Sequence, residues 1–174
     1  MFKARTRSEN LMALALIGLG IFFRVMPHPD NFTPTAAIAL FSGVVLPAAL
    51  AFTVPLLVMM ASDLFIGLHP LFWLVWVSFA LVGLIGSLIR EKDGVLPVGL
   101  AVFGSSALFF IISNLGVFLF ENMYPKSLAG LAECFTMALP FFRNSLLGDL
   151  FYSAVLFSLF AACRRAVHAT QKNV

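Results

Sequence analysis

The sequence predicts an all-α membrane protein of six transmembrane helices, with both termini in the cytoplasm and its polar residues gathered on the outer side. Three observations carry this prediction. Of the 174 residues, 61% are hydrophobic and only 11% are charged, which is too little charge to cover the surface of a soluble domain. Apolar runs of spanning length recur along the chain. Basic residues concentrate in every second connecting segment.

Four apolar runs come close to the roughly 20 residues that a spanning helix needs. They cover residues 11–26, 71–89, 98–120 and 145–163. The first run follows Lys3, Arg5 and Arg7, as the apolar part of a secretory signal would, but no small-x-small cleavage site comes after it. We therefore expect residues 11–26 to form a retained first helix.

The segment 35–61 is too long for one comfortable span and short for two. Pro47 lies at its middle and favours two short helices, 35–46 and 48–61, because proline interrupts a helix. Two helices there place eight of the eleven basic residues on the inner side, whereas one helix gives a best split of six against five. Residues 1–174 are thus predicted to form one transmembrane domain. Its inner basic residues are Lys3, Arg5, Arg7, Arg90, Lys92, Arg164, Arg165 and Lys172.

The outer helix ends and loops hold the candidate substrate-binding residues. An ionisable group at membrane depth costs about 2.5–3.5 kcal/mol on insertion scales, so it normally pairs or faces a wet cavity. A purely structural interpretation gives ion pairs, Arg24 with Asp63 or Arg143 with Asp149, and an interhelical hydrogen bond for Asn114. So large a set on one side favours a binding cup. The candidates are Arg24, His28, Asn31, Thr33, Asp63, His69, Asn114, Tyr124, Arg143, Asn144 and Asp149.

Two outer loops are predicted to shape this cup. The first, residues 26–34, contains three prolines, which restrict the unfolded chain and leave Asn31 and Thr33 to present polar groups. Thr33 is also a candidate N-cap of the second helix, and a simple turn is the alternative reading of the loop. The second loop, residues 121–144, is predicted to act as a lid. Its aromatic residues are Tyr124, Phe135, Phe141 and Phe142.

Motifs of catalysis are missing from the sequence. It contains no GxxxxGK[ST], HExxH, CxxC, GxSxG or dinucleotide-binding pattern, so we expect no enzyme activity and no cofactor. Cys134 and Cys163 are too few and too far apart for a disulfide framework or a zinc motif, and we expect no metal site. The net charge of +3 is explained by residues that flank cytoplasmic helix ends, so no nucleic-acid partner is expected.

The assembled pattern resembles the membrane-embedded substrate-binding (S) components of energy-coupling-factor vitamin transporters. The resemblance implies a six-helix bundle in the bacterial inner membrane that captures a micronutrient under its outer loops, in some cases with an ATP-driven coupling module. The closest similarity is to a bacterial family of this superfamily with a PHPxNFTP loop. The segments that carry it are PHPDNFTP (27–34), SDLFIGLH (62–69), SNLGVF (113–118), YPKSLAGL (124–131) and PFFRNSLLGDLFY (140–152).

The layout is also similar to the solitary cobalamin transporters of Gram-negative bacteria. His28, Asp63 and Arg143 occupy the places of an outer histidine, an aspartate after the third helix and an arginine before the last. This similarity implies cobalamin or a related corrinoid as the substrate. The chain departs from the pattern, because residues 62–80 contain no cysteine to ligate cobalt. It also lacks the AxxxA docking pattern of S components, since Ala13 is followed by Ile17, which implies a partner-independent carrier or an altered docking surface.

The sequence therefore predicts a substrate-capturing transport protein for a vitamin-like micronutrient. Its residues are expected to contact the ligand from the first outer loop, to accept hydrogen bonds through Asp63 and Asp149, and to donate them through Arg24 and Arg143. His69 is an alternative polar or metal contact. Two other functions fit the same residues: a proton- or sodium-coupled carrier with the two aspartates as coupling groups, and a non-transporting membrane scaffold whose outer loops bind a protein.

Overall fold

The computed structural model describes residues 6–90 and 94–172, and all the regular structure in them is α-helical. The all-α prediction is confirmed for this part of the chain, while Lys3, Arg5 and Lys92 lie outside the described residues. The helices are α1 (Arg7–Val25), α2 (Thr35–Val45), α3 (Ala48–Ile66), α4 (Phe72–Leu88), α5 (Val95–Phe120) and α6 (Leu128–Lys172).

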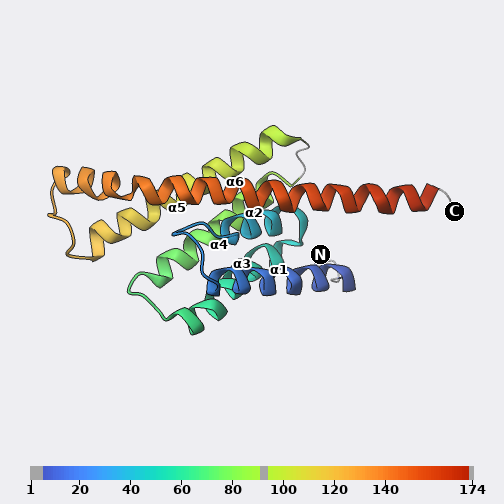
Figure 1. Ribbon diagram of the computed structural model, residues 1–174, viewed down its shortest axis with the longest axis horizontal. Helices are drawn as coiled ribbons and strands as arrows, with labels where there is room; N and C mark the ends of the chain where they lie inside the picture. The colour runs from blue at the N-terminus through green and yellow to red at the C-terminus, as the bar shows by residue number, and fades with distance from the viewer. Residues whose placement is uncertain (1–5, 91–93, 173–174) are drawn as a thin grey trace.

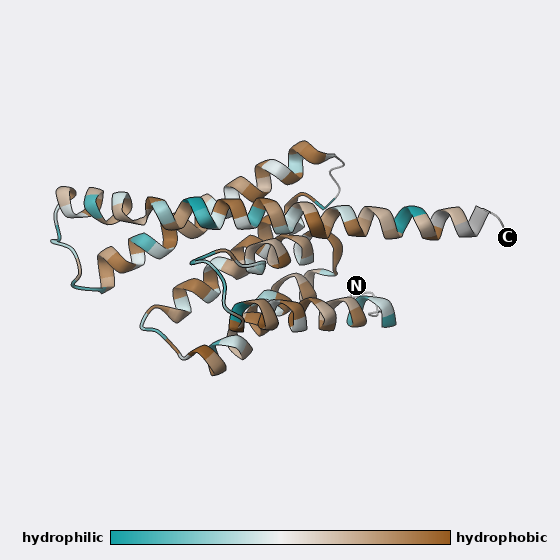
Figure 2. Ribbon diagram, in the orientation of Figure 1, coloured by the Kyte–Doolittle hydropathy of each residue, from teal (hydrophilic) through white to brown (hydrophobic). Residues whose placement is uncertain are grey.

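Four of these helices, α1, α3, α5 and α6, are long and apolar enough to cross a membrane. The other two are shorter, with 11 residues in α2 and 17 in α4. Large hydrophobic side chains lie on the outside of the bundle, for example Leu64 at 83% and Val95 at 88% exposure. Figure 2 shows the apolar colour over most of the helical surface, with polar residues at the loops and at intervals along α6. The chain is thus a membrane protein by the length and composition of its helices.

Successive helices run in alternating directions (Figure 1). The connections α1–α2, α3–α4 and α5–α6 lie at the left-hand ends of their helices in this view, and the free ends of α1 and α6 point to the right. The loops predicted to be on one side therefore do share one end of the molecule. That end carries most of the polar candidates.

Helix α2 is the centre of the bundle. It packs against all five other helices, and its first nine residues are buried. Its approach to α4 depends on glycine, since a Cβ atom on Gly43 would overlap the carbonyl oxygen of Gly83 and lie 2.8 Å from the Cα atom of Gly86. Small residues allow two helix backbones to come this close. The carbonyl groups at the C-terminal end of α2 have no partner within the helix. Arg90 supplies donors for two of them, since its Nη2 donates to the carbonyls of Gly43 (2.8 Å) and Leu46 (2.5 Å).

Several predicted helix boundaries are wrong. Helix α1 begins at Arg7 rather than residue 11, α5 begins at Val95 rather than residue 98, and α6 ends at Lys172 rather than residue 163. Helix α3 continues to Ile66 rather than residue 61, so Asp63 lies in the last turn of α3 and not in the segment after it. Helix α6 begins at Leu128 rather than residue 145, and its 45 residues rise about 67 Å. The predicted lid loop 121–144 is therefore a short connection, 121–127, followed by helix.

The early start of α6 has local causes. Ser127 accepts a hydrogen bond from the backbone N–H of Gly130 at 3.2 Å, which is the geometry of an N-cap. The first turns of α6 then pack on α5, where Phe135 lies edge-on to Phe110 at 5.4 Å between ring centroids. Pro140 lies inside the helix without ending it. The sequence predicts a loop here because this segment is polar by comparison with its neighbours, but its residues form a helix that packs on α5.

Candidate functional site

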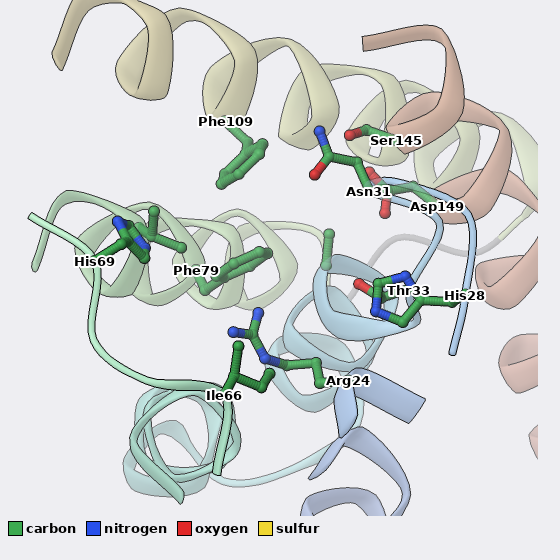
Figure 3. Close-up of a pocket in the computed structure, with 12 residues that line it drawn as sticks. Arg24, His28, Asn31, Thr33, Ile66, His69, Phe79, Phe109, Ser145 and Asp149 are labelled. Atoms are coloured by element: carbon green, nitrogen blue, oxygen red, sulfur yellow. The ribbon is translucent and has the colours of Figure 1, made fainter. Parts of the chain in front are cut away.

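A cavity of about 320 Å³ lies below the connecting loops, at the end of the molecule that carries the polar candidates (Figure 3). It is enclosed by α1, the 26–34 loop and residues from all the remaining helices. Six of the eleven predicted site residues line it. The lining residues are Arg24, His28, Asn31, Thr33, Ala36, Ile66, His69, Val75, Phe79, Phe109, Ser145 and Asp149.

Arg24 and Asp63 form an ion pair between α1 and α3. Nη2 of Arg24 lies 2.6 Å from Oδ1 of Asp63, and Nε of Arg24 donates to Ser62 Oγ at 2.7 Å. The other carboxylate oxygen of Asp63 accepts a hydrogen bond from Trp76 Nε1 at 2.7 Å. Both oxygens of this 3%-exposed aspartate are thus engaged by the protein. The ion pair predicted between these two residues is confirmed, and Asp63 is absent from the residues that line the cavity.

Arg24 also faces the cavity. Figure 3 shows its guanidinium group beside Ile66 and directed toward Phe79. Its Nε and Nη2 atoms are used by Ser62 and Asp63, whereas Nη1 makes no hydrogen bond with the described residues. The ion pair therefore leaves one donor edge of Arg24 free at the cavity.

Asp149 has different surroundings. It is 6% exposed, and its Oδ2 atom accepts a hydrogen bond from Ser106 Oγ of α5 at 2.6 Å. Within the described side chains, no nitrogen of Lys, Arg or His lies within 4 Å of its carboxylate. The predicted Arg143–Asp149 pair is wrong, because six residues of helix turn Arg143 onto another face, where it is exposed. Asp149 thus lines the cavity without a counter-ion.

The opposite wall of the cavity is aromatic. The rings of Phe79 on α4 and Phe109 on α5 stack with 5.2 Å between their centroids and 25° between their planes. Ser145 lies one turn before Asp149 on the same face of α6. The sequence does not predict Phe79, Phe109 or Ser145 as site residues. The two phenylalanines do not stand out in a set of 20. Ser145, like Ser106 beside Asp149, could have been recognised as a hydroxyl in an apolar run.

The 26–34 loop brings Asn31 to the cavity. Phe32 anchors the loop against Tyr152 of α6, with 5.6 Å between ring centroids, and its N–H donates to the carbonyl of Pro29 at 3.0 Å. Asn31 has a φ of 59°, a left-handed conformation that asparagine tolerates better than most residues. Thr33 is not the N-cap predicted for α2: Pro34 holds that position, and Thr33 Oγ1 lies 3.1 Å from Thr35 Oγ1.

A second cavity of about 230 Å³ adjoins the first and shares Asn31, Phe109 and Ser145 with it. Asn114 lines this second cavity, and its Nδ2 donates to the carbonyl of Phe110 in its own helix at 2.7 Å. The predicted interhelical bond of that side chain is therefore wrong. The α5–α6 contact there is made by its backbone oxygen, which accepts from Cys134 Sγ at 3.4 Å.

The remaining candidates lie elsewhere. Tyr124 and Asn144 are half-buried and Arg143 is exposed, and none of the three lines either cavity. Phe141 and Phe142, predicted as part of a lid loop, line the second cavity from the first half of α6. Among the described residues, no three side chains of His, Cys, Asp or Glu are grouped so that they could hold a metal ion.

Residues 4–171 match a family described as a family of unknown function, DUF6580, and the chain belongs to this family. No curated protein and no solved structure matches the chain.

Proposed function

We propose that this member of the DUF6580 family is a transport protein of the bacterial inner membrane that captures a compact, vitamin-like organic solute in the larger cavity. One observation carries the proposal: the cavity combines an unpaired carboxylate, a guanidinium edge and an amide with a wall of stacked aromatic rings. Pockets for small organic molecules are mostly apolar, with a few placed polar groups. Such a site at the looped end of a membrane bundle suits solute capture.

The proposed orientation has six membrane-crossing elements and cytoplasmic termini. Helix α4, with 17 residues, is at the lower limit of a span. Helix α2 rises only about 17 Å, but the other helices enclose it, so its ends need not reach the lipid surface. The inner position of eight basic residues favours this orientation over its inverse. The cavity then opens to the outside.

We propose that transport by this protein does not require a docked ATP-driven module. In the S components that the sequence resembles, small residues on the first helix form the docking surface. Here Ala13 is 4% exposed and packs in the core cluster with Leu16, Ile38 and Phe41, with Ile17 against the same cluster. That face of α1 is turned into the protein. A solitary carrier is the simpler interpretation.

The volume of the cavity bears on the size of the ligand. Ligand pockets range over about 300–1,000 Å³, and 320 Å³ is at the small end. A complete corrinoid is much larger and would require the outer loops and the α5–α6 pair to move apart. We therefore propose a smaller solute, with cobalamin and cobinamide as test ligands for the corrinoid alternative.

The first test is mass spectrometry of small molecules bound to the purified protein, followed by calorimetry with a panel of vitamins that includes both corrinoids. Phe109→Ala should weaken binding of the ligand about tenfold or more, because it removes half of the aromatic wall. Phe103→Ala is the matched control, since Phe103 is 54% exposed on the same helix. A scaffold subunit would carry no small molecule and would copurify with a protein.

A coupled carrier is the second candidate, and one observation supports it. Asp149 is a buried carboxylate that faces the cavity without a counter-ion, as a proton- or sodium-coupling group would. Asp63 is poorly suited to this role because Arg24 and Trp76 occupy both its oxygens. Uptake into proteoliposomes with and without a proton or sodium gradient separates this mechanism from passive capture.

A further inference from the structure

We infer that the larger cavity binds a monovalent organic cation: a compact molecule whose protonated amino group pairs with Asp149 and whose apolar body lies against Phe79 and Phe109. The inference rests on the proposed function, since it assigns the chemical class of the solute that the cavity captures.

The first step is the charge at the site. Arg24 is neutralised by Asp63 at 2.6 Å, whereas Asp149 has no cationic partner among the described side chains. Helix α5 brings Ser106 and Phe109 to this region and α4 brings Val75 and Phe79, none of which is charged. When Asp149 is ionised and the histidines are neutral, the site has one negative charge in excess.

Neither of the two histidines forms an ion pair with Asp149. His28 and His69 line the cavity but are exposed at its rim, and neither has a nitrogen within 4 Å of the Asp149 carboxylate. Nδ1 of His28 lies 2.9 Å from the carbonyl of Pro29, so this nitrogen is turned to the loop. The negative charge of the Asp149 carboxylate can therefore be neutralised at close range by a proton or by a bound cation.

The second step is the hydrogen-bonding capacity around Asp149. Its Oδ2 atom accepts from Ser106, and its Oδ1 atom has no hydrogen-bond donor among the described residues. An ammonium group has three N–H donors and no acceptor. Such a group can donate to Oδ1 in a charge-assisted bond, which is about twice as strong as a neutral one. Asn31 and Ser145 provide further acceptor oxygens on the same side of the cavity (Figure 3).

The third step concerns the rest of the ligand. The stacked rings of Phe79 and Phe109 provide an apolar wall that also attracts cations through their faces. The free edge of Arg24 suits a neutral acceptor such as a hydroxyl or carbonyl oxygen. A zwitterion would bring no net charge and would leave the excess negative charge of the site uncompensated. The site therefore fits a monocation with a neutral polar group.

The test uses three probes of similar shape on the full-length protein in lipid nanodiscs: phenethylamine, 2-phenylethanol and 3-phenylpropionate. They are a cation, a neutral molecule and an anion. We expect the amine to bind about ten- to a hundredfold more tightly than the alcohol, the range given by one charge-assisted hydrogen bond. We expect the anion to bind more weakly than the alcohol.

Asp149→Asn should remove the preference for the amine and leave binding of the alcohol within about twofold. Glu133→Gln is the control, because Glu133 is an exposed carboxylate of the same helix and lies outside both cavities. If Asp149→Asn does not fold, Ser106→Ala serves as the second variant. Loss of the Ser106 hydroxyl frees the carboxylate to turn, so the preference should fall while binding of the alcohol persists.

Equal or tighter binding of the alcohol or the anion by the wild-type protein would overturn the inference, as would a preference that survives in Asp149→Asn. Failure of phenethylamine to bind at millimolar concentration counts against it equally. If neutral or anionic vitamins bind and Phe109→Ala abolishes that binding, the cation is wrong and solute capture stands. If no small molecule of any charge binds or copurifies, the proposed function is wrong as well.

Discussion

Asp63 and Asp149 differ in what they touch, although both are buried near the same end of the molecule. Asp63 is held by Arg24, and Trp76 donates to its second oxygen. Asp149 has only the hydroxyl of Ser106. The sequence predicts that both aspartates lie at membrane depth, but it does not distinguish between the Arg24–Asp63 and Arg143–Asp149 pairs. Depth follows from position along a helix, whereas pairing depends on how the helices are rotated, which an all-apolar helix does not reveal.

Removal of either partner of the Arg24–Asp63 pair should destabilise the protein. Arg24→Gln leaves the charge of Asp63, whose side chain is 2% exposed, without its partner. Asp63→Asn does the same to Arg24, whose side chain is 17% exposed. The expected cost is roughly 3–5 kcal/mol of unfolding free energy, measured by chemical denaturation in mild detergent. Arg143→Gln, at an exposed arginine near the same end, should change it by less than about 0.5 kcal/mol. Equal effects of all three variants would show that the pair is not a structural lock.

Asp149→Asn should raise the stability of the protein, in contrast to the two substitutions of the Arg24–Asp63 pair. Its carboxylate is buried without a counter-ion, so a neutral amide of the same shape removes a desolvation cost. We expect an increase of about 0.5–2 kcal/mol in the free energy of unfolding of the empty protein, the range of single stabilising substitutions. The same denaturation measurement checks it. A loss of stability as large as that of Asp63→Asn would indicate that Asp149 has a structural partner.

The helices show which local signals can be trusted. Pro47 does separate two helices, and the connection between α2 and α3 falls where the sequence predicts it. Pro140 and Pro55, by contrast, both lie inside helices. A proline breaks a helix where no neighbour supports the distorted turn, and helices in a bundle supply that support. The beginning of α6 at Leu128 is not predicted, because the polar residues of 121–144 indicate a loop and the contacts of its first turns with α5 are not encoded in a local pattern.

The contact between α2 and α4 gives a prediction at the scale of an element. Gly43→Ala places a methyl group against the backbone of Gly83 and Gly86, neither of which can move aside alone. We expect a loss of about 1–3 kcal/mol, as for overpacking in a core, and a lower folded yield in fluorescence-detected gel filtration. Gly104→Ala is the control, because nothing lies within 4 Å of its added Cβ atom. Unchanged stability of Gly43→Ala would mean that the two helices pack less closely than described.

At the scale of the whole molecule, the sequence predicted the fold class and the clustering of polar loops at one end. It predicted six of the residues that line the cavity, because charged and hydroxyl side chains stand out from an apolar background. It missed the aromatic wall, since stacked phenylalanines differ from lipid-facing ones only in their contacts. It also placed Arg143 in the site, because chain order suggests which end a residue occupies but not which side of its helix.

The orientation in the membrane can be tested by labelling of single cysteines. Cys163 is exposed and should first be replaced by serine, while Cys134 is buried. Cysteines at Asp30 and Asn122, both exposed in connecting loops, should react with an impermeant thiol reagent from the periplasmic side. Cysteines at Asn10 and Arg165, exposed near the other end, should react only after the membrane is opened. Labelling of Asn10 or Arg165 from outside in intact cells would contradict cytoplasmic termini.

The unbroken course of α6 has a mechanical consequence. Asp149 in the cavity and Arg164 near the far end of the bundle belong to one rod, about 22 Å apart along its axis. Arg164 lies over the ring of Phe160, which in turn contacts Phe41 of the central helix. A stiff rod pivoted at such a contact acts as a lever: a sideways push at the solute end becomes a displacement at the opposite end. A tilt of α6 at Asp149 therefore requires a displacement of its basic far end.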